Sequence, residues 1–302
     1  MAVTVPSAAR HLLLLVTVTV VSVAAATPSS PGRPFRTLYA FGDSLTDTGN
    51  THSTTGPYSF GVSHPPYGAT FFHRPTNRYS DGRLVVEFLA TDVLALPSLL
   101  LELTTMSSPS PVWTGAICRK VLDVRTGLYQ HFLPPYLSTL SRGVGDALFW
   151  AGEIGANDYG YSFMAPDALP SERIRNMAID RITTFLHGLL KRGAKYVVVQ
   201  GMPLTGCLPL AMTLSQPWDR ENLSCVASIN RQNLDHNHHL QAGLHRLRRS
   251  HPDAIIAYAD YHAAHLAVVR SPARYGFTEP FKACCGTGGG AYRRRDGPAA
   301  AG

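Results

Sequence analysis

The sequence of 302 residues is poor in charged side chains: Asp, Glu, Lys and Arg make up 16% of it, whereas 45% of the residues are hydrophobic. It also lacks internal repeats, and no stretch in its middle has the composition of a flexible linker. A chain of this length and composition can bury one substantial core. We therefore expect one domain, residues 27–290, followed by a disordered tail at residues 291–302.

Long apolar runs are equally scarce. The run Leu12–Val23 follows a basic residue, Arg10, and precedes the small residues Ala24–Ala26. A basic start, a short apolar stretch and small residues at its end are the pattern of a secretory signal peptide, here residues 1–26. No later segment is long and apolar enough to cross a bilayer. We therefore expect a secreted, extracellular protein without an integral membrane span in the mature chain.

Cysteine is infrequent, and the five residues of this type form an odd number. Export exposes thiols to an oxidising compartment, so we expect disulfides, with at least one cysteine left over. Cys207 and Cys225 flank a loop that contains two prolines, and closing this loop would restrict the unfolded chain. They are the preferred pair. Asn222 begins the only Asn-x-Ser/Thr triplet of the sequence, which suits a glycan on an exposed loop.

Acidic residues are too few to balance the basic ones, and the formal net charge is +7. Such an excess can indicate a nucleic acid or an anionic surface as a partner. Much of it lies at Arg246, Arg248 and Arg249 in a predicted helix and at Arg293–Arg295, without interleaved aromatic residues for stacking on bases. This pattern argues against a nucleic-acid partner.

Short apolar runs and helical periodicities alternate along the chain. The clearest helix is Ser171–Arg192, with Ser171 as its N-cap and Gly193 beyond its end. The predicted strands are Thr37–Phe41, Ala147–Ala151, Tyr196–Val199 and Ala254–Ala259, and the other predicted helices are Leu84–Leu96, Ala227–Arg249 and Ala263–Val269. Apolar strands that alternate with helices belong in a parallel sheet covered on both faces. The expected fold class is α/β, a three-layer α/β/α sandwich with a mostly parallel central sheet.

Ligands of such sheets bind at the carboxyl ends of the strands, and Ser44, Asn157 and Asp260 all follow predicted strands. Ser44 stands in a strand-to-turn position beside Gly42 and Asp43, which can present its hydroxyl. A serine becomes a nucleophile when a base takes its proton and donors stabilise the oxyanion on the substrate. Asp and Ser are also ordinary turn residues, so spacing alone leaves a purely structural turn as the alternative.

The segment Phe41–Asn50, Phe-Gly-Asp-Ser-Leu-Thr-Asp-Thr-Gly-Asn, resembles the first block of the plant GDSL esterase/lipase family, which is part of the SGNH hydrolases. Similar segments follow in order, so that the resemblance covers most of residues 35–290. They are Arg78–Phe88, Gly152–Tyr159, Gly206–Pro209, Tyr258–Tyr261, Tyr275–Phe277 and Ala283–Gly286. The resemblance implies a flavodoxin-like three-layer fold and makes residues 27–290 a hydrolase domain.

The resemblance also implies a carboxylic ester hydrolase that acts on esters or lipids through an acyl-enzyme. In the family the serine of the first block, here Ser44, is the nucleophile, and its backbone N–H lines the oxyanion hole. The asparagine of the third block, here Asn157, donates to the same hole from its side chain. The second block, an Asn-Phe-Ala stretch before consecutive glycines, is not found, and Gly115 is the nearest position for its backbone donor. We expect no cofactor, a small-molecule ester or lipid as partner, and a monomer.

The family's Asp-x-x-His block supplies the general base and the carboxylate that orients it. It is not found after the double cysteine, and no histidine follows His265, so the hydrolase domain looks incomplete at its C-terminal end. Asp235–His238 has the right spacing but lies in a predicted helix, where we expect an exposed polar face; neighbouring histidines there do not converge on a metal ion. Asp260 and His262 are the better substitute, because they follow a strand. The alternative function is a catalytically inactive, truncated GDSL-fold protein that binds a ligand.

Overall fold

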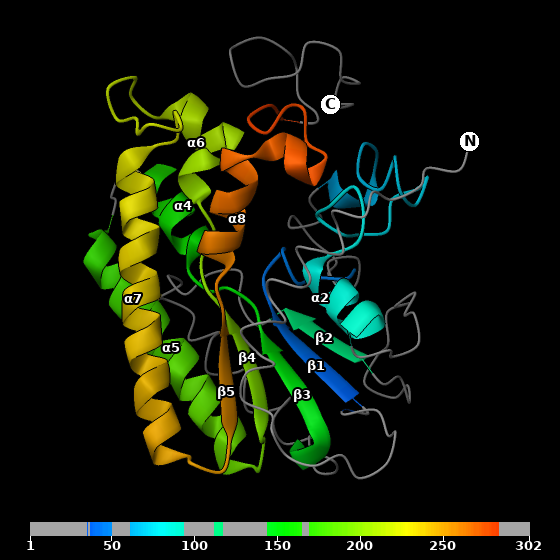
Figure 1. Ribbon diagram of the computed structural model, residues 1–302, viewed down its shortest axis with the longest axis vertical. Helices are drawn as coiled ribbons and strands as arrows, with labels where there is room; N and C mark the ends of the chain where they lie inside the picture. Colours follow the sequence, from blue (N-terminus) through cyan, green and yellow to red (C-terminus); the bar gives the residue numbers. More distant parts are fainter. Residues whose placement is uncertain are drawn as a thin grey trace. The chain divides into compact units, whose positions relative to one another are not determined.

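The computed structural model describes Phe35 and residues 37–49, 61–93, 112–116, 144–164 and 169–283, with the backbone alone for 112–116 (Figure 1). These residues form two compact units, each described by itself. The sheet unit comprises the described residues up to Gln200 together with His239–Tyr258, and the disulfide unit comprises Gly201–His238 and the described residues from Ala259 onward. The predicted signal peptide and C-terminal tail lie outside the described residues, and the domain bounds 27–290 stay a prediction.

Five strands form one sheet: β1 (Thr37–Gly42), β2 (Val112–Ala116), β3 (Ala147–Ala151), β4 (Tyr196–Gln200) and β5 (Ile255–Ala259). Their order is β2-β1-β3-β4-β5, and β1 pairs in parallel with both β2 and β3, as β3 does with β4. This is the flavodoxin-like order, in which the winding reverses between β1 and β3. The predicted α/β class is confirmed, as are four of the strands, whereas β2 was not predicted.

A hydrophobic core joins the sheet to α5 (Ser171–Lys191) and to the C-terminal half of α7 (Ala227–Ser250). In Figure 1 these helices lie on one side of the strands and α2 (Val85–Phe88) lies on the other, so both faces carry helices. Phe185 of α5 meets Phe41 edge to face, with 5.1 Å between the ring centroids. The helix residues buried in this core include Ile174, Ala178, Ile182, Leu186 and Leu189 of α5 and Leu240, Leu244 and Leu247 of α7. Removing this apolar surface from water is the main stabilising contribution to the unit.

The ends of α5 differ slightly from the prediction. Pro170, with φ −55° and ψ 133°, is the N-cap, and its carbonyl accepts hydrogen bonds from the amides of Arg173 and Ile174. The prediction of Ser171 as N-cap is therefore wrong by one residue, because the extended backbone at Pro170 already delivers the chain into the helix. Gly193, with φ 93°, follows the end of the helix as predicted, in a conformation that suits glycine.

The remaining helices are mostly short. The predicted helix 84–96 is a single α-turn, α2, that continues as a π-helical segment, η3 (Leu89–Val93), and its last residues lie outside the described ones. The predicted helices 227–249 and 263–269 correspond to α7 and to α8 (Tyr261–Arg270). The others are α4 (Ala156–Met164), α6 (Pro209–Leu214), η2 (Gly61–Ser63), η4 (Val144–Asp146), η5 (Thr205–Cys207) and η6 (Pro272–Tyr275). None of the described helices is both long and apolar enough to span a membrane.

A buried ion pair organises the segment that leads into α2. Arg78 is 3% exposed, and its guanidinium donates to both carboxylate oxygens of Glu87, from Nη2 to Oε1 at 2.7 Å and from Nε to Oε2 at 3.1 Å. Glu87 also accepts a hydrogen bond from the amide of Leu84 at 2.8 Å, which caps α2. Breaking such a buried bidentate pair would leave an uncompensated charge. The motif segment Arg78–Phe88 therefore has a structural role.

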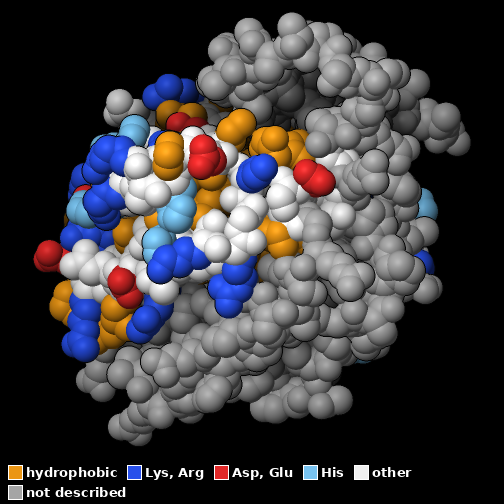
Figure 2. Space-filling model, turned by 90° about the horizontal axis from the view of Figure 1, so that it is seen from below, with side chains coloured by type: hydrophobic (Ala, Val, Ile, Leu, Met, Phe, Trp, Pro, Cys, Tyr) orange, Lys and Arg blue, Asp and Glu red, His pale blue; other side chains and the backbone are white. Residues whose placement is uncertain are grey.

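Basic side chains lie among side chains of other types on the part of the face that Figure 2 colours. Figure 2 shows Lys and Arg among uncharged and hydrophobic side chains, with Asp and Glu between them. Of the arginines near the end of α7, Arg246 and Arg249 are exposed, whereas Nε of Arg248 donates to the carbonyl of Ile256 at 2.8 Å. Burial lowers the pKa of Arg248 from its ordinary value. Arg248 thus connects α7 to β5 by a hydrogen bond. The absence of a nucleic-acid partner stays a prediction.

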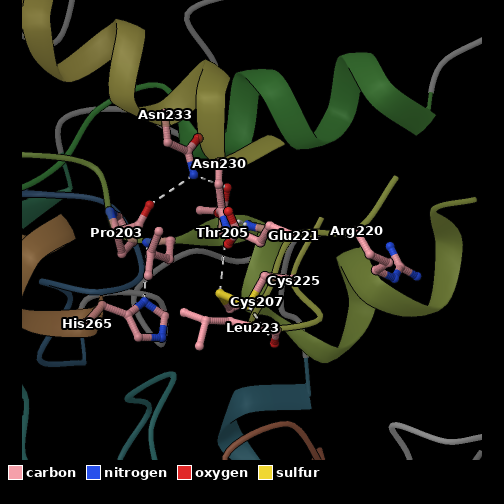
Figure 3. Close-up of a disulfide and its surroundings, with 12 residues drawn as sticks. Pro203, Thr205, Cys207, Arg220, Glu221, Leu223, Cys225, Asn230, Asn233 and His265 are labelled. Atoms are coloured by element: carbon pink, nitrogen blue, oxygen red, sulfur yellow. Dashed lines mark hydrogen bonds between the residues drawn. A yellow bond between two sulfur atoms is a disulfide. The ribbon is translucent and has the colours of Figure 1, made fainter. Parts of the chain in front are cut away.

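The disulfide unit contains the predicted cross-link. Cys207 and Cys225 form a disulfide that closes a loop containing α6, and this prediction is confirmed (Figure 3). Arg220 and Val226 pair as an isolated antiparallel bridge next to it. Asn222 is exposed within the closed loop. The loop is therefore held at both its ends, while the predicted glycan acceptor faces solvent.

The predicted exposed polar face at Asp235–His238 is wrong for half of its residues. Asp235 and His238 are exposed, but His236 and Asn237 are each 2% exposed. Asn230 and Asn233 are buried as well, and together with Asn237 they recur every three or four residues along α7. This spacing places the three asparagines on one face of the helix. The polar composition of α7 therefore concealed a buried stripe.

The stripe satisfies the backbone that follows β4. Asn237 donates to the carbonyl of Met202 at 3.0 Å and accepts from its amide at 2.7 Å. Asn233 donates to the carbonyl of Pro203 at 2.9 Å, and Figure 3 shows Asn233 and Asn230 pointing toward this segment. Buried peptide groups outside regular structure need such partners. The asparagines of α7 therefore supply the hydrogen bonds that a neighbouring strand would otherwise give to this backbone.

Candidate active site

Ser44 lies in a tight turn directly after β1. The amides of Thr46 and Asp47 both donate to the carbonyl of Asp43 at 3.0 Å, and the amide of Leu45 donates to Oδ1 of Asp43 at 2.9 Å. Asp43 thus closes the turn with its backbone and with its side chain. Ser44 is half-buried within this turn. Because β1 lies between β2 and β3, the turn occupies the switch point at the carboxyl edge of the sheet, where ligands of such folds bind.

Two glycines let the ends of β1 and β3 approach each other. The amide of Gly152 donates to the carbonyl of Phe41 at 2.6 Å. A Cβ added to Gly152 would overlap the Thr46 hydroxyl oxygen and would lie 3.2 Å from the Cα of Gly42. A Cβ on Gly42 would in turn lie 2.7 Å from that hydroxyl oxygen. The turn that carries Ser44 therefore packs against the end of β3 without room for a side chain on either glycine.

Asn157 reaches the same turn from α4. Gly155, with φ 115°, makes the bend between β3 and α4, and Asn157 is the second residue of that helix. Its Nδ2 donates to Oδ2 of Asp43 at 3.2 Å. Since a carboxylate only accepts hydrogen bonds, this contact sets the orientation of the amide, with its nitrogen toward Asp43. The structure thus brings Asn157 to the residue next to Ser44, across 114 positions of sequence.

Glu153 is a buried acidic residue that the sequence analysis did not single out. It is 2% exposed, and its carboxyl group forms a hydrogen bond with that of Asp43 and accepts one from the amide of Ala156 at 3.3 Å. Burial raises the pKa of Glu153 well above its usual range, and the charges of Asp43 and Asp158 raise it further. Desolvation beside another acidic group favours the protonated form of a carboxyl group. The available signal was an acidic residue placed two positions after a fully buried strand.

Gly115, the nearest position for the family's second block, lies in β2 and stands opposite Phe41 in the parallel pairing of β2 with β1. The next pair in the register joins Ala116 to Gly42. The structure therefore places the backbone of Gly115 at the carboxyl end of the strand next to the Ser44 turn. Its role as an oxyanion donor stays a prediction.

The residues considered as a substitute base belong to the disulfide unit. The carboxylate of Asp260 accepts a hydrogen bond from the amide of Ala263 at 2.9 Å and so caps α8. His262 is half-buried, and this burial lowers its pKa, against the opposing charges of Asp260 and Glu221. Asp260 therefore has a structural use, while the base stays unassigned.

One group of described side chains has the composition of a metal site. Cys207, Glu221 and Cys225 bring a carboxylate oxygen and two sulfurs within 4.8 Å of one another. The sulfurs are bonded to each other, so neither is a thiolate ligand. Glu221 instead accepts a hydrogen bond from Nδ2 of Asn230 at 2.7 Å. These three residues therefore form a disulfide and a neighbouring hydrogen bond, and they do not offer the ligands of a metal site.

Comparison with known proteins bears directly on this site. The family model described as GDSL-like lipase/acylhydrolase matches residues 38–297. The chain belongs to the GDSL-like lipase/acylhydrolase family. It is 44% identical over 292 residues to the GDSL esterase/lipase At3g48460 of Arabidopsis thaliana, covering 87% of this chain and 76% of that relative. It is 33% identical over 290 residues to the GDSL esterase/lipase At1g31550 of the same plant, covering 85% and 73%. The resemblance inferred from the motif segments is confirmed.

Membership of the GDSL-like family supports a carboxylic ester hydrolase that acts on a small-molecule substrate. The matched range begins in β1 and extends past the disulfide unit's last described residue, so both units belong to the family fold. The first and third GDSL motif segments are the two that meet through Asp43. The fold thus brings together motif segments that are distant in the sequence.

Proposed function

We propose that this chain is a secreted ester hydrolase that acts on carboxylic esters or lipids with Ser44 as the nucleophile. Membership of the family supports the class of reaction. The observation that supports the residue is the position of Ser44 in the turn after β1, at the switch point of the sheet, with the Asn157 amide bonded to the adjacent Asp43.

In the proposed reaction, the Ser44 hydroxyl oxygen attacks the acyl carbon while a general base takes its proton. The carbonyl oxygen becomes an oxyanion, and collapse of this intermediate expels the alcohol, which takes up the proton. Water then attacks the acyl group on Ser44, releases the carboxylic acid and returns a proton to the serine. The sequence assigns no base, and His262 is the first histidine to test for this role.

The proposed oxyanion donors are the backbone N–H of Ser44, the side chain of Asn157 and the backbone at Gly115. Nδ2 of Asn157 carries two protons, and the bond to Asp43 uses one of them. The second proton is the one proposed to reach the substrate oxygen. Removing such a donor raises the barrier by about 3 kcal/mol. Asn157→Ala is therefore expected to lower kcat by about 100-fold.

Labelling with a fluorophosphonate probe tests the nucleophile without requiring the natural substrate. An activated serine oxygen attacks phosphorus and displaces fluoride. We expect the secreted wild-type chain to be labelled and Ser44→Ala to remain unlabelled, with Ser63→Ala, outside the proposed machinery, as a matched serine control that is labelled like the wild type. Hydrolysis of p-nitrophenyl butyrate should follow the same pattern.

Other outcomes lead to different conclusions. Equal labelling of wild type and Ser44→Ala would remove Ser44 from the mechanism. A folded wild-type chain that takes no label would support the alternative, a GDSL-fold protein that binds a ligand without hydrolysing it. Labelling that is lost in His262→Ala would assign the base.

Secretion is part of the proposal. The disulfide between Cys207 and Cys225 suits an oxidising compartment, and Asn222 is exposed as a glycan acceptor requires. Expression of the full chain in plant cells should yield the protein in the medium, with a mobility that increases on glycosidase treatment. Asn222→Gln should remove this change in mobility. Retention of the full chain in the cytosol would contradict the proposal.

A further inference from the structure

We propose that Glu153 is a positioning residue of this active site: its carboxyl group donates a hydrogen bond to Asp43, and Asp43 in turn holds both the Asn157 amide and the Ser44 turn. The inference rests on the proposed function of Ser44 and deepens it. Glu153 acts through Asp43, and its own carboxyl group is buried behind the turn.

The hydrogen bonds at Asp43 define the direction of the linkage. Oδ1 of Asp43 accepts from the amide of Leu45 at 2.9 Å, and Oδ2 accepts from Nδ2 of Asn157 at 3.2 Å. Both oxygens of Asp43 thus already accept from N–H donors. The hydrogen bond between Asp43 and Glu153 therefore needs its proton from Glu153. Asp43 gathers one donor from each of three places: the turn, α4 and the end of β3.

The surroundings of Glu153 favour the neutral acid. Its side chain is among the fully buried large side chains, and among the described residues the charged groups that act on it are Asp43 and Asp158, both acidic. The amide of Ala156, which donates to Oε2 at 3.3 Å, is the one opposing influence. Burial and these two negative charges raise the pKa of Glu153 together. The proton is therefore retained at pH values where an exposed glutamate has lost it.

Loss of this proton would break the hydrogen bond from Glu153 to Asp43. As pH rises through the raised pKa, two adjacent carboxylates face each other in a buried place where Asp158 is also near, and Asp43 loses one of its three donors. Repulsion then displaces Asp43, together with the amide and the turn that it holds. A displacement of about 1 Å in a catalytic group can cost about 100-fold in rate. We expect this loss in kcat, with KM little changed, because the affected groups act on the oxyanion.

The experiment compares wild type, Glu153→Gln and Glu153→Ala, with Glu172→Gln as a matched control on an exposed carboxylate of α5. Gln keeps the shape, an N–H donor for Asp43 and an oxygen for Ala156, but it does not titrate. Selective ¹⁵N-asparagine labelling reports the side-chain amide of Asn157, which is assigned by its disappearance in Asn157→Asp. The amide resonance and the kinetics of p-nitrophenyl butyrate hydrolysis are followed from mildly acidic to alkaline pH.

In wild type and Glu172→Gln, we expect the Asn157 amide resonance to shift in one titration step and kcat to fall over the same pH range. Glu153→Gln should show neither change and should keep a kcat close to that of wild type. Glu153→Ala should lose about 100-fold in kcat at all pH values, as expected for a misplaced catalytic group.

The same amide step in Glu153→Gln, or no step in wild type, would overturn the proposal even if Glu153→Ala fails to fold. An identical alkaline fall in kcat in wild type and Glu153→Gln would also overturn it. A wild-type chain that shows the amide step but hydrolyses no ester would support the linkage from Glu153 to Asn157 and would contradict the proposed function.

Discussion

The contact between Gly152 and the Ser44 turn leads to a prediction for Gly152→Ala. The new methyl group would overlap the Thr46 hydroxyl and would lie 3.0 Å from the carbonyl oxygen of Phe41 and 3.2 Å from the Cα of Gly42. The hydroxyl can rotate away, but the two backbone atoms belong to β1, which is paired on both sides. We therefore expect a loss of about 3 kcal/mol in unfolding free energy, at the upper end of the usual cost of overpacking.

The same substitution should impair catalysis beyond its effect on stability. The turn that carries Ser44 is the part of the contact that can yield, because it lies beyond the residues of β1 that pair with β2 and β3. A shift of about 1 Å there would lower kcat by about 100-fold in the folded fraction. Urea denaturation and ester kinetics at a temperature where the variant is folded separate the two effects.

Two controls test the reasoning. Gly160→Ala adds the same methyl group in α4, where it would meet nothing within 4 Å, and should raise stability by about 0.5–1 kcal/mol because alanine favours a helix. Adding Thr46→Ala to Gly152→Ala removes the nearest obstacle and should recover about 1 kcal/mol, as expected for residues in contact. A Gly152→Ala variant with wild-type stability and kcat would refute the argument that the two strand ends leave no room.

Three further predictions concern stability. Replacing Cys207 and Cys225 by serine opens a loop with a sequence separation of 18 and should cost about 3 kcal/mol in urea denaturation, a difference that reductant abolishes. Asn237→Leu leaves the buried amide and carbonyl of Met202 without partners and should cost about 3 kcal/mol; wild-type stability in this variant would contradict the role of the asparagine stripe. Because the folded state raises the pKa of Glu153, the stability from its bound proton is fully present below the ordinary glutamate pKa and is lost as pH rises through the raised pKa. Wild-type stability should therefore fall by about 1.4 kcal/mol per pH unit across that window relative to Glu153→Gln, as measured by denaturation at a series of pH values.

Much of the local structure followed from the sequence. Apolar runs predicted β1, β3, β4 and β5, and helical spacing predicted α5 and α7, because burial imposes a periodicity on neighbouring residues. The disulfide between Cys207 and Cys225 could also be predicted, since the two residues bound one loop. Motif segments pointed to Ser44 and Asn157, whose catalytic roles stay predictions, and the structure joins the two segments through Asp43.

Other features depend on contacts between distant residues. The sequence showed no signal for β2, whose place beside β1 is set by pairing. It also did not reveal which polar face of α7 is buried, because Asn230, Asn233 and Asn237 look like solvent-facing residues until the backbone after β4 presents groups that need partners.

Glu153 shows most clearly which features the sequence determines and which depend on the tertiary structure. The sequence by itself determined where β1, β3, β4, β5, α5 and α7 form and which serine follows β1, because these depend on side chains close together in the chain. An acidic residue after a buried strand is compatible with a solvent-exposed turn, with a salt bridge or with a shared proton. Only the tertiary structure decided among these, by burying Glu153 against Asp43 and near the acidic Asp158, since desolvation and the sign of the nearest charge come from the packing of separate segments.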